Sequence, residues 1–312
     1  MILHSSFINS LLAEYHIREL AHLTGVKAHT IRIWEQRYNL LTPKRTTTNI
    51  RTYGDDDLRL LLNVALLAEH GYRISRIALM TPEQRAREVE SLASQPHPDE
   101  THTIQQLTRA TLTLDADLFE QALAAAVAAD GLEQVTLRVI YPFFERVGIL
   151  WQTGTINPAQ EHLISNLVRQ KVIAAIDQQS HPPVRPGART FVLFLPEREL
   201  HELSLLFMHY LLRMRGHRVV YLGQNVPARD LGLVCELTTP HYLLTVLTVV
   251  PERDDVAQYV AWLVRQYPTV GLLLYGTQVQ ADDLPLPAAA HRFKRMTDLT
   301  AWLDELPEQS AR

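Results

Sequence analysis

The sequence has a single cysteine, Cys235, and no long apolar run among its 312 residues. One thiol cannot form an internal disulfide, which is typical of a protein kept in a reducing compartment. A membrane-spanning helix needs about 20 consecutive apolar residues, and the longest apolar run, at 242–250, has the size of a strand. No basic segment followed by an apolar stretch opens the sequence, so no secretory signal is expected. We therefore expect a cytoplasmic protein with no membrane partner.

The sequence also lacks an excess of positive charge, since 30 Lys and Arg face 34 Asp and Glu for a net charge of -4. As an average, this disfavours nucleic acid as a partner. The charge is divided unevenly, however: residues 14–81 hold ten basic and seven acidic side chains, which gives +3 and leaves -7 for the remainder. A small basic segment attached to an acidic body is the charge pattern of a nucleic-acid reader.

Residues 14–82 are predicted to form a helix-turn-helix followed by a wing. Two short helices are separated by a turn containing Gly25, and the second helix covers about 28–37. The stretch 44–53 is rich in threonine and predicts a two-stranded wing. Three aspartates at 55–57 favour the start of another helix, because carboxylates stabilise a helix N-terminus.

In a helix-turn-helix the second helix enters the major groove, and wing contacts fix its register on the backbone. Side chains suited to base edges and phosphates lie on both elements. They are Thr30, Arg32 and Arg37 on the helix and Lys44, Arg45 and Arg51 on the wing. Trp34 and Tyr38 are expected in the core. The alternative is a protein-binding domain or a solvated basic face.

This region resembles the MerR family of winged-helix transcription regulators. The resemblance is carried by Tyr15–Ala21, Gly25–Val26, Thr30–Leu40, Pro43–Arg45 and Ile50–Tyr53. It implies that Arg32, Arg45 and Arg51 contact DNA, that Tyr53 supports the wing and a phosphate, and that the protein binds operator DNA as a dimer and deforms it. Metal sensing through thiolates is not expected, because the stretch after this region has no cysteine.

The body is predicted to hold two further parts. Residues 83–100 are expected to form a linker, and 101–180 a four-helix bundle with helices near 101–112, 115–129, 131–151 and 157–179. A second proline-rich linker at 180–187 follows. Residues 188–312 alternate strands (191–195, 219–222, 242–249, 270–275) with helices, which predicts a doubly wound parallel sheet. The expected fold class is thus multidomain: an α winged helix-turn-helix, a four-helix bundle and an α/β Rossmann-like sheet.

Open α/β sheets bind ligands at the carboxyl ends of their strands. At the first such end, Glu199 precedes His201 by two residues, the pairing of a metal ligand with the carboxylate that orients it. A solvated loop histidine is the alternative. No nucleophile triad, glycine-rich phosphate loop or Cys/His zinc spacing is visible in the sequence.

Residues 100–312 resemble the cobalamin-binding module of B12-dependent MerR regulators of the CarH type and of corrinoid methyltransferase proteins. The resemblance implies that His201 ligates cobalt from the lower face with Glu199 as its acidic partner. It implies that Trp151, Glu161 and His162 cap the upper face. Further cofactor-lining positions are Ser204, Thr245, Leu247, Tyr275 and Gly276.

The departures from the family pattern put cobalamin binding in question. Ser204 stands where the family has glycine, Thr245 where it has serine, and Tyr275 where it has the first glycine of a pair. Tyr275 either stacks on the nucleotide tail of the cofactor or fills its slot. Gln152 stands where light-sensing members carry histidine, which disfavours a photoproduct with two histidine ligands.

Three hypotheses remain open. The first is a DNA-binding repressor in which cobalamin, as adenosylcobalamin or another form and with or without light, sets the oligomeric state (homodimer or tetramer) and so operator binding. The second is a cofactor-independent regulator whose degenerate B12-like domain serves oligomerisation or senses a partner or other ligand. The third is a component of a corrinoid-dependent enzyme, which is disfavoured because no partner domain fits in the length. We expect no enzyme.

Overall fold

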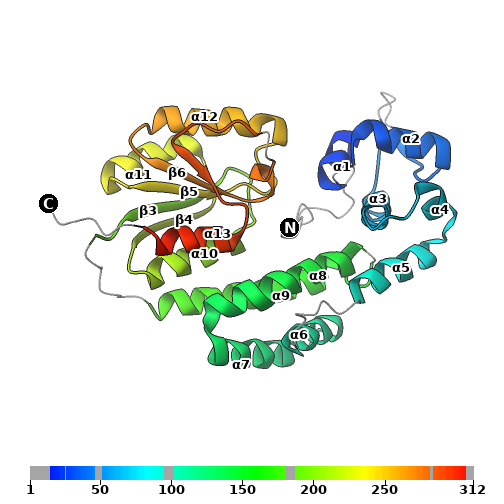
Figure 1. The fold of residues 1–312 in the computed structure, drawn as a ribbon, viewed down its shortest axis with the longest axis horizontal. Helices are drawn as coiled ribbons and strands as arrows, with labels where there is room; N and C mark the ends of the chain where they lie inside the picture. Colours follow the sequence, from blue (N-terminus) through cyan, green and yellow to red (C-terminus); the bar gives the residue numbers. More distant parts are fainter. Residues whose placement is uncertain are drawn as a thin grey trace. The chain divides into compact units, whose positions relative to one another are not determined.

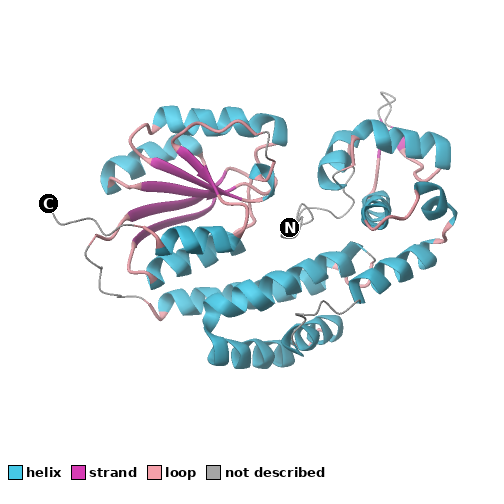
Figure 2. Ribbon diagram, viewed as in Figure 1, coloured by secondary structure: helices cyan, strands magenta, loops and turns pink. Residues whose placement is uncertain are grey.

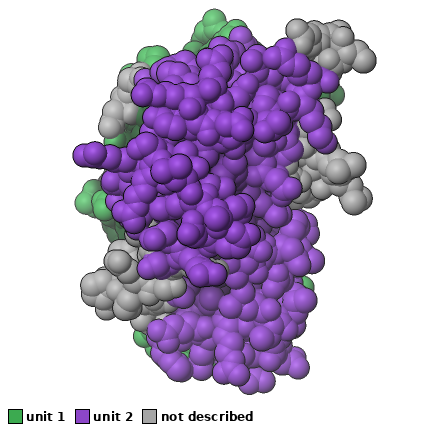
Figure 3. All heavy atoms as spheres, turned by 90° about the vertical axis from the view of Figure 1, so that its right-hand side faces the viewer, with its two compact units in different colours: residues 1–2, 124–138, 164–312 green, residues 3–123, 139–163 purple. Residues whose placement is uncertain are grey.

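A computed structural model describes residues 15–24, 26–45, 51–94, 102–152, 154–179, 187–281 and 284–306. The chain divides into two compact units (Figure 3). Unit 1 comprises residues 1–2, 124–138 and 164–312, and unit 2 comprises residues 3–123 and 139–163. Each unit has its own hydrophobic core. The helices of the predicted bundle at 101–180 are shared between these two units.

Unit 2 begins with the predicted helix-turn-helix and wing. Helices α1 (Ile17–Thr24) and α2 (Ala28–Tyr38) precede the antiparallel strands β1 (Lys44–Arg45) and β2 (Arg51–Thr52), and α3 (Asp55–Glu69) and α4 (Ile74–Leu79) follow. Gly25 and the wing tip at 46–50 lie outside the described residues. This part of the fold is as the sequence predicts.

Helix α3 forms because its sequence suits both its end and its buried face. At its start the Gly54 amide donates a hydrogen bond to the Asp57 carboxylate at 2.9 Å, which satisfies an amide that the helix leaves unpaired. Leu58, Leu61 and Leu67 recur at helical spacing, and all three are fully buried. The predicted helix start at the three aspartates is correct.

The predicted linker at 83–100 is wrong in its first half. Helix α5 (Pro82–Ser94) covers this stretch, and Val89 is fully buried in the same cluster as Val64 of α3. The Tyr72 hydroxyl donates to the Glu88 carboxylate at 2.8 Å, which secures the helix to the preceding segment. The stretch is rich in charged residues, so its sequence shows no clear apolar face and did not predict a helix. Residues 95–100 lie outside the described residues.

The helices after this stretch are α6 (His102–Thr113), α7 (Ala116–Val135), α8 (Tyr141–Gln152) and α9 (Pro158–Asp177). Gly131 interrupts α7 with φ 77° and ψ 156°, close to the predicted break between the second and third helices. A π-helical turn at Thr136–Ile140 leads into α8. The second predicted linker lies outside the described residues except for Gly187.

Unit 1 is built around a parallel five-stranded sheet in the order β4-β3-β5-β6-β7 (Figures 1 and 2). The strands are β3 (Thr190–Pro196), β4 (Arg218–Val226), β5 (Tyr242–Val246), β6 (Gly271–Tyr275) and β7 (Ala290–Arg292). The first four are the predicted strands. β7 was not predicted, because three residues, two of them polar, give no apolar run.

Helices cover both faces of this sheet, as expected of a doubly wound fold. Figure 1 shows α11 (Leu231–Thr238) and α12 (Val256–Gln266) on one face and α10 (Leu203–Met214) and α13 (Met296–Asp304) on the other. Val192 and Phe194 of β3 belong to the core cluster beneath α11 and α12. Because strand residues alternate between faces, the buried residues between them point to the opposite layer.

Candidate functional site

The His201 loop lies at the point where the strand order of the sheet reverses. Strand β3 ends at Pro196 and α10 begins at Leu203, and β3 lies between β4 and β5 in the sheet. The chain thus turns to one side for β4 and to the other for β5, and in open α/β sheets such a reversal marks the usual place for a ligand. The sequence placed His201 at this end, and the topology makes it the switch point.

The Glu199 carboxylate is the most densely hydrogen-bonded group of this loop. One oxygen accepts from the backbone amides of Thr248, Val249 and Val250 at 3.1, 2.8 and 3.2 Å, which tie it to the loop after β5. The other accepts from the amides of Leu200 and His201 at 3.0 and 3.1 Å and contacts Nδ1 of His201. Glu199 is fully buried.

This environment keeps Glu199 ionised. Burial by itself would raise the pKa of the carboxyl group, but the hydrogen bond and charge of His201 and the amides of Val249 and Val250 outweigh it and lower the pKa to about 2. Five backbone donors and an imidazole thus hold a buried carboxylate in one orientation. Its function in the structure is to fix the histidine ring.

The second ring nitrogen of His201 is set up for a ligand. With Nδ1 turned to Glu199, Nε2 is buried and has no hydrogen-bond partner among the described residues. A buried polar atom without a partner costs free energy, on the order of 1–3 kcal/mol, so it is uncommon unless a ligand completes it. Histidine ligands of metals hold their other nitrogen on a carboxylate in this way. His201 and Glu199 fit the lower ligand position of cobalamin.

The loop is braced from β4. The Arg198 amide donates to the Asn225 side chain at 2.8 Å, and the Gln224 side chain donates to the Leu200 carbonyl at 2.6 Å. Arg198 adopts a left-handed backbone with φ 70°, a conformation that non-glycine residues seldom take. This turn sets the positions of Glu199 and His201, and nothing in the sequence predicts it.

The remaining predicted residues of unit 1 are all buried. Ser204 lies in the first turn of α10, and the hydroxyl of Thr245 on β5 has no partner among the described residues. Gly276 has φ 116°, and a Cβ there would fall 2.7 Å from the carbonyl carbon of Leu247 and closer still to its oxygen. The glycine is thus required by the approach of Leu247, whose amide donates to the Tyr275 carbonyl at 2.8 Å.

Sequence reasoning missed Glu202, the residue after the histidine. Its buried carboxylate pairs with Arg169 of α9 and accepts from the Tyr221 hydroxyl at 3.1 Å. Tyr221 in turn stacks on His209, with ring centroids 5.0 Å apart. Burial, then the charge of Arg213, lowers the pKa of His209 to about 4, so this ring is neutral. Only the fold brings these groups together, since they come from a helix, a loop and a strand.

The predicted upper-face residues belong to unit 2. Trp151 ends α8 and is 7% exposed, while Glu161 and His162 lie in the first turns of α9. The Glu161 carboxylate lies 3.2 Å from Nδ1 of His162. The guanidinium of Arg59 on α3 lies over the Trp151 ring, 5.3 Å from its centroid. Their arrangement toward His201 stays a prediction.

The predicted DNA-contacting residues divide into two groups by exposure. Arg32 and Arg37 on α2 and Lys44 and Arg45 on β1 are exposed, and Thr30 is half-buried. Exposed residues of α2 recur at helical spacing and form one face. They are His29, Arg32, Ile33, Gln36 and Arg37. His29, Ile33 and Gln36 were not singled out from the sequence, where only charge and hydroxyl groups gave a signal.

Arg51 and Tyr53 are held by Glu35 of α2. Glu35 accepts from Nε of Arg51 at 3.1 Å and from the Tyr53 hydroxyl at 3.1 Å. Tyr53 is 1% exposed, and burial followed by the hydrogen bond to Glu35 raises its pKa to about 12. These two hydrogen bonds connect the wing to the second helix, and through one of them Tyr53 supports the wing. Its predicted phosphate contact stays a prediction.

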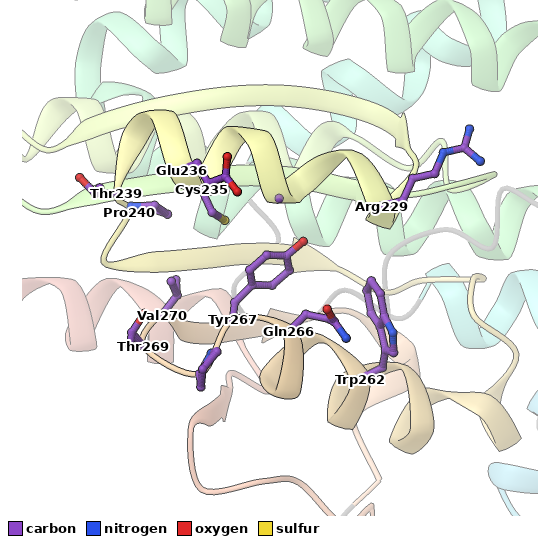
Figure 4. Close-up of a pocket in the computed structure, with 12 residues that line it drawn as sticks. Arg229, Cys235, Glu236, Thr239, Pro240, Trp262, Gln266, Tyr267, Thr269 and Val270 are labelled. Atoms are coloured by element: carbon purple, nitrogen blue, oxygen red, sulfur yellow. The ribbon is translucent and has the colours of Figure 1, made fainter.

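A groove of about 700 Å³ runs between α11 and α12 of unit 1 (Figure 4). Tyr267 lies in its middle, with Trp262 and Arg229 toward one end and Thr239 and Thr269 toward the other. No predicted cofactor residue lines it. Among the residues that the structure describes, no group of three or more His, Cys, Asp and Glu could hold a metal ion, and no helix is long and apolar enough to span a membrane.

A winged helix-turn-helix with an exposed basic face, joined to a doubly wound sheet whose switch point carries a histidine with a buried ring nitrogen, defines a DNA-binding regulator with a B12-binding module. Residues 15–84 match the MerR HTH family of regulatory proteins, and residues 103–175 match the B12 binding domain. The class of protein is thus a MerR-type transcription regulator.

The chain belongs to the family of the HTH-type transcriptional repressor CarH of Myxococcus xanthus. The two are 33% identical over 240 residues, which cover 73% of this chain and 77% of CarH. The HTH-type transcriptional repressor CarA of the same organism is 27% identical over 226 residues, 72% of this chain and 73% of CarA. Among solved structures, the monomethylamine corrinoid protein of Methanosarcina barkeri has a TM-score of 0.49 at 14% identity, covering 64% of this chain and 95% of that protein.

Proposed function

We propose that this protein is a cytoplasmic transcriptional repressor that binds cobalamin with His201 and operator DNA with α2 and the wing. The single observation that carries the cofactor assignment is the buried, unpartnered Nε2 of His201, whose ring Glu199 fixes. Through Nε2, His201 would hold the cobalt ion that cobalamin supplies, with Glu199 orienting the ring.

Glu199 orients the His201 ring for ligand binding. The Glu199 carboxylate beside Nδ1 fixes the orientation of the ring, so that Nε2 is the nitrogen available to a ligand. Because six donors surround Glu199, the ring is oriented before any ligand arrives, and binding needs little reordering.

The DNA-binding part acts through exposed cations. Arg32 and Arg37 on α2 reach bases and phosphates, while Lys44 and Arg45 on β1 reach the backbone beside them. Glu35 sets the angle between helix and wing through Arg51 and Tyr53. A homodimer or tetramer brings several DNA-binding segments to a two-fold operator. A cofactor that changes the oligomeric state therefore changes operator affinity.

Visible absorption of the purified protein with adenosylcobalamin in the dark tests the cofactor assignment. We expect corrin bands that stay with the protein after gel filtration and that shift when His201 is replaced by alanine. The exposed His102 provides a control, since His102→Ala leaves the spectrum unchanged. Bands that are absent, or that are identical in His201→Ala and wild type, contradict the assignment.

Gel filtration and operator gel shifts, each with and without the cofactor and before and after illumination, test the coupling. We expect the oligomeric state and the operator affinity to change together. An assembly and an affinity that do not respond to bound cofactor contradict the coupling and leave DNA binding intact.

The second candidate is a regulator of the same class that works without cofactor. The burial of Tyr275 and Trp151, 9% and 7% exposed, favours it, because both side chains then serve as core. Its sheet would serve oligomerisation or sense another ligand. Absence of corrin bands together with normal operator binding decides for this candidate.

A further inference from the structure

The DNA-binding segment and α8 are packed into one unit. Ile149 of α8 packs against the cluster formed by Leu40, Val64, Leu67 and others of the helix-turn-helix region. Two residues further along α8, Trp151 lies under the guanidinium of Arg59, 5.3 Å from ring centroid to cation. Figure 3 shows this unit in one colour. The residue assigned to the upper face of cobalamin therefore also belongs to the contact with the DNA reader.

Arg59 is held in this contact by little else. Its side chain is 32% exposed and lies 4.0 Å from the fully exposed Asp56 carboxylate, too far for a strong ion pair. Its Nε is buried and has no hydrogen-bond partner among the described residues. The guanidinium of Arg59 thus faces an aromatic ring, a cation–π contact.

The face of the Trp151 ring that Arg59 covers is closed to a second partner. Trp151 is 7% exposed, so a corrin ring can pack on the indole only if groups that now cover it move away. Arg59 is such a group and belongs to the DNA-binding segment, and it leaves at low cost because its stem is flexible. We propose that cobalamin and Arg59 compete for Trp151, so that cofactor binding detaches α3 from α8. This inference rests on the proposed cofactor function.

The competition makes a reciprocal prediction. Whatever weakens the Arg59 contact strengthens cobalamin binding by up to the same factor, because the contact and the cofactor compete for one ring. A single cation–π contact of this degree of burial corresponds to a change of about 3- to 30-fold in affinity. In this way cobalamin changes how the DNA-binding segment is held on α8 without itself touching DNA.

The test is a titration of the full chain with adenosylcobalamin in the dark, followed by corrin absorption. Arg59→Gln is expected to bind about 3- to 30-fold more tightly than wild type, and Arg59→Lys, which keeps a cation, to fall between them. Arg76→Gln is the matched control, because Arg76 stacks on Tyr72 at 5.1 Å within the DNA-binding segment. It is expected to bind like wild type.

Hydrogen exchange of α3 and α8 gives a second readout that does not depend on operator binding. We expect cofactor to speed exchange in wild type, and Arg59→Gln to exchange fast without it. Equal or weaker cobalamin affinity in Arg59→Gln overturns the competition while cobalamin sensing stands. Wild type without any corrin bands overturns the proposed cofactor function, and the competition falls with it.

Discussion

Replacing Glu199 by glutamine should reduce the stability of the sheet unit in a way that depends on pH. Folding lowers the pKa of this fully buried group from its ordinary value of 4.5 to about 2. At 1.36 kcal/mol per pKa unit, the ionised carboxylate stabilises the native state by about 3 kcal/mol relative to its protonated form. The amide of glutamine, which is never ionised, lacks this stabilisation and turns a donor toward backbone amides that are donors themselves.

The pH dependence follows from the direction of the shift. Because the pKa is lowered in the folded state, the contribution is complete above the unfolded value and is lost as pH falls toward the folded value of about 2. The difference in free energy of unfolding between wild type and Glu199→Gln should therefore shrink by about 1.4 kcal/mol for each pH unit below 4.5.

Urea unfolding at a series of pH values measures this difference. Glu197→Gln is the control, because Glu197 is exposed two residues earlier in the same loop, and its effect should be close to zero at every pH. Subtracting variant from wild type removes the acid sensitivity of all other groups. A difference that stays constant between about pH 5 and pH 3 would refute the assignment of a buried, ionised Glu199.

Three shorter predictions concern the backbone and the reader. Gly276→Ala should cost more than about 3 kcal/mol, because a Cβ meets the Leu247 backbone, whereas Gly71→Ala, with open space around it, should cost about 1 kcal/mol; equal losses in thermal unfolding would contradict this. Lys44→Ala should lower the salt dependence of operator binding by about one phosphate contact, and an unchanged slope would remove Lys44 from the interface. Glu35→Gln should weaken operator binding by about 10-fold without unfolding the protein, since one charge-assisted hydrogen bond to the wing is lost; full affinity in gel shifts would show that the wing angle does not depend on Glu35.

The elements that were predictable are those whose signal is local. Helix periodicity and the three aspartates predicted α3, and branched apolar runs predicted β3 to β6, because one strand or one helix face buries a continuous pattern. Helix α5 and strand β7 were missed for the same reason. Helix α5 buries mainly Val89 and is otherwise charged, and strand β7 has only three residues with no apolar run.

The candidate site was only partly predictable. His201 and Glu199 stand two residues apart at a strand end, so their chemistry is readable in one short segment. Glu202 gave no signal, because its partners Arg169 and Tyr221 lie on other elements, 33 and 19 residues away. The contact of Arg59 with Trp151 joins positions that nothing in the pattern connects.

The sequence by itself determined the class of this protein: a basic reader, helices, and a doubly wound sheet with a histidine at its first strand end. Residue types and spacings carry that information because helices, strands and charged segments form over a few turns of chain. Only the tertiary structure decided that the Glu199 carboxylate is saturated with donors, that Nε2 of His201 is left without a partner among the described residues, and that Arg59 covers Trp151. These are contacts between distant segments, and burial, which sets their energy, exists only once the chain has packed.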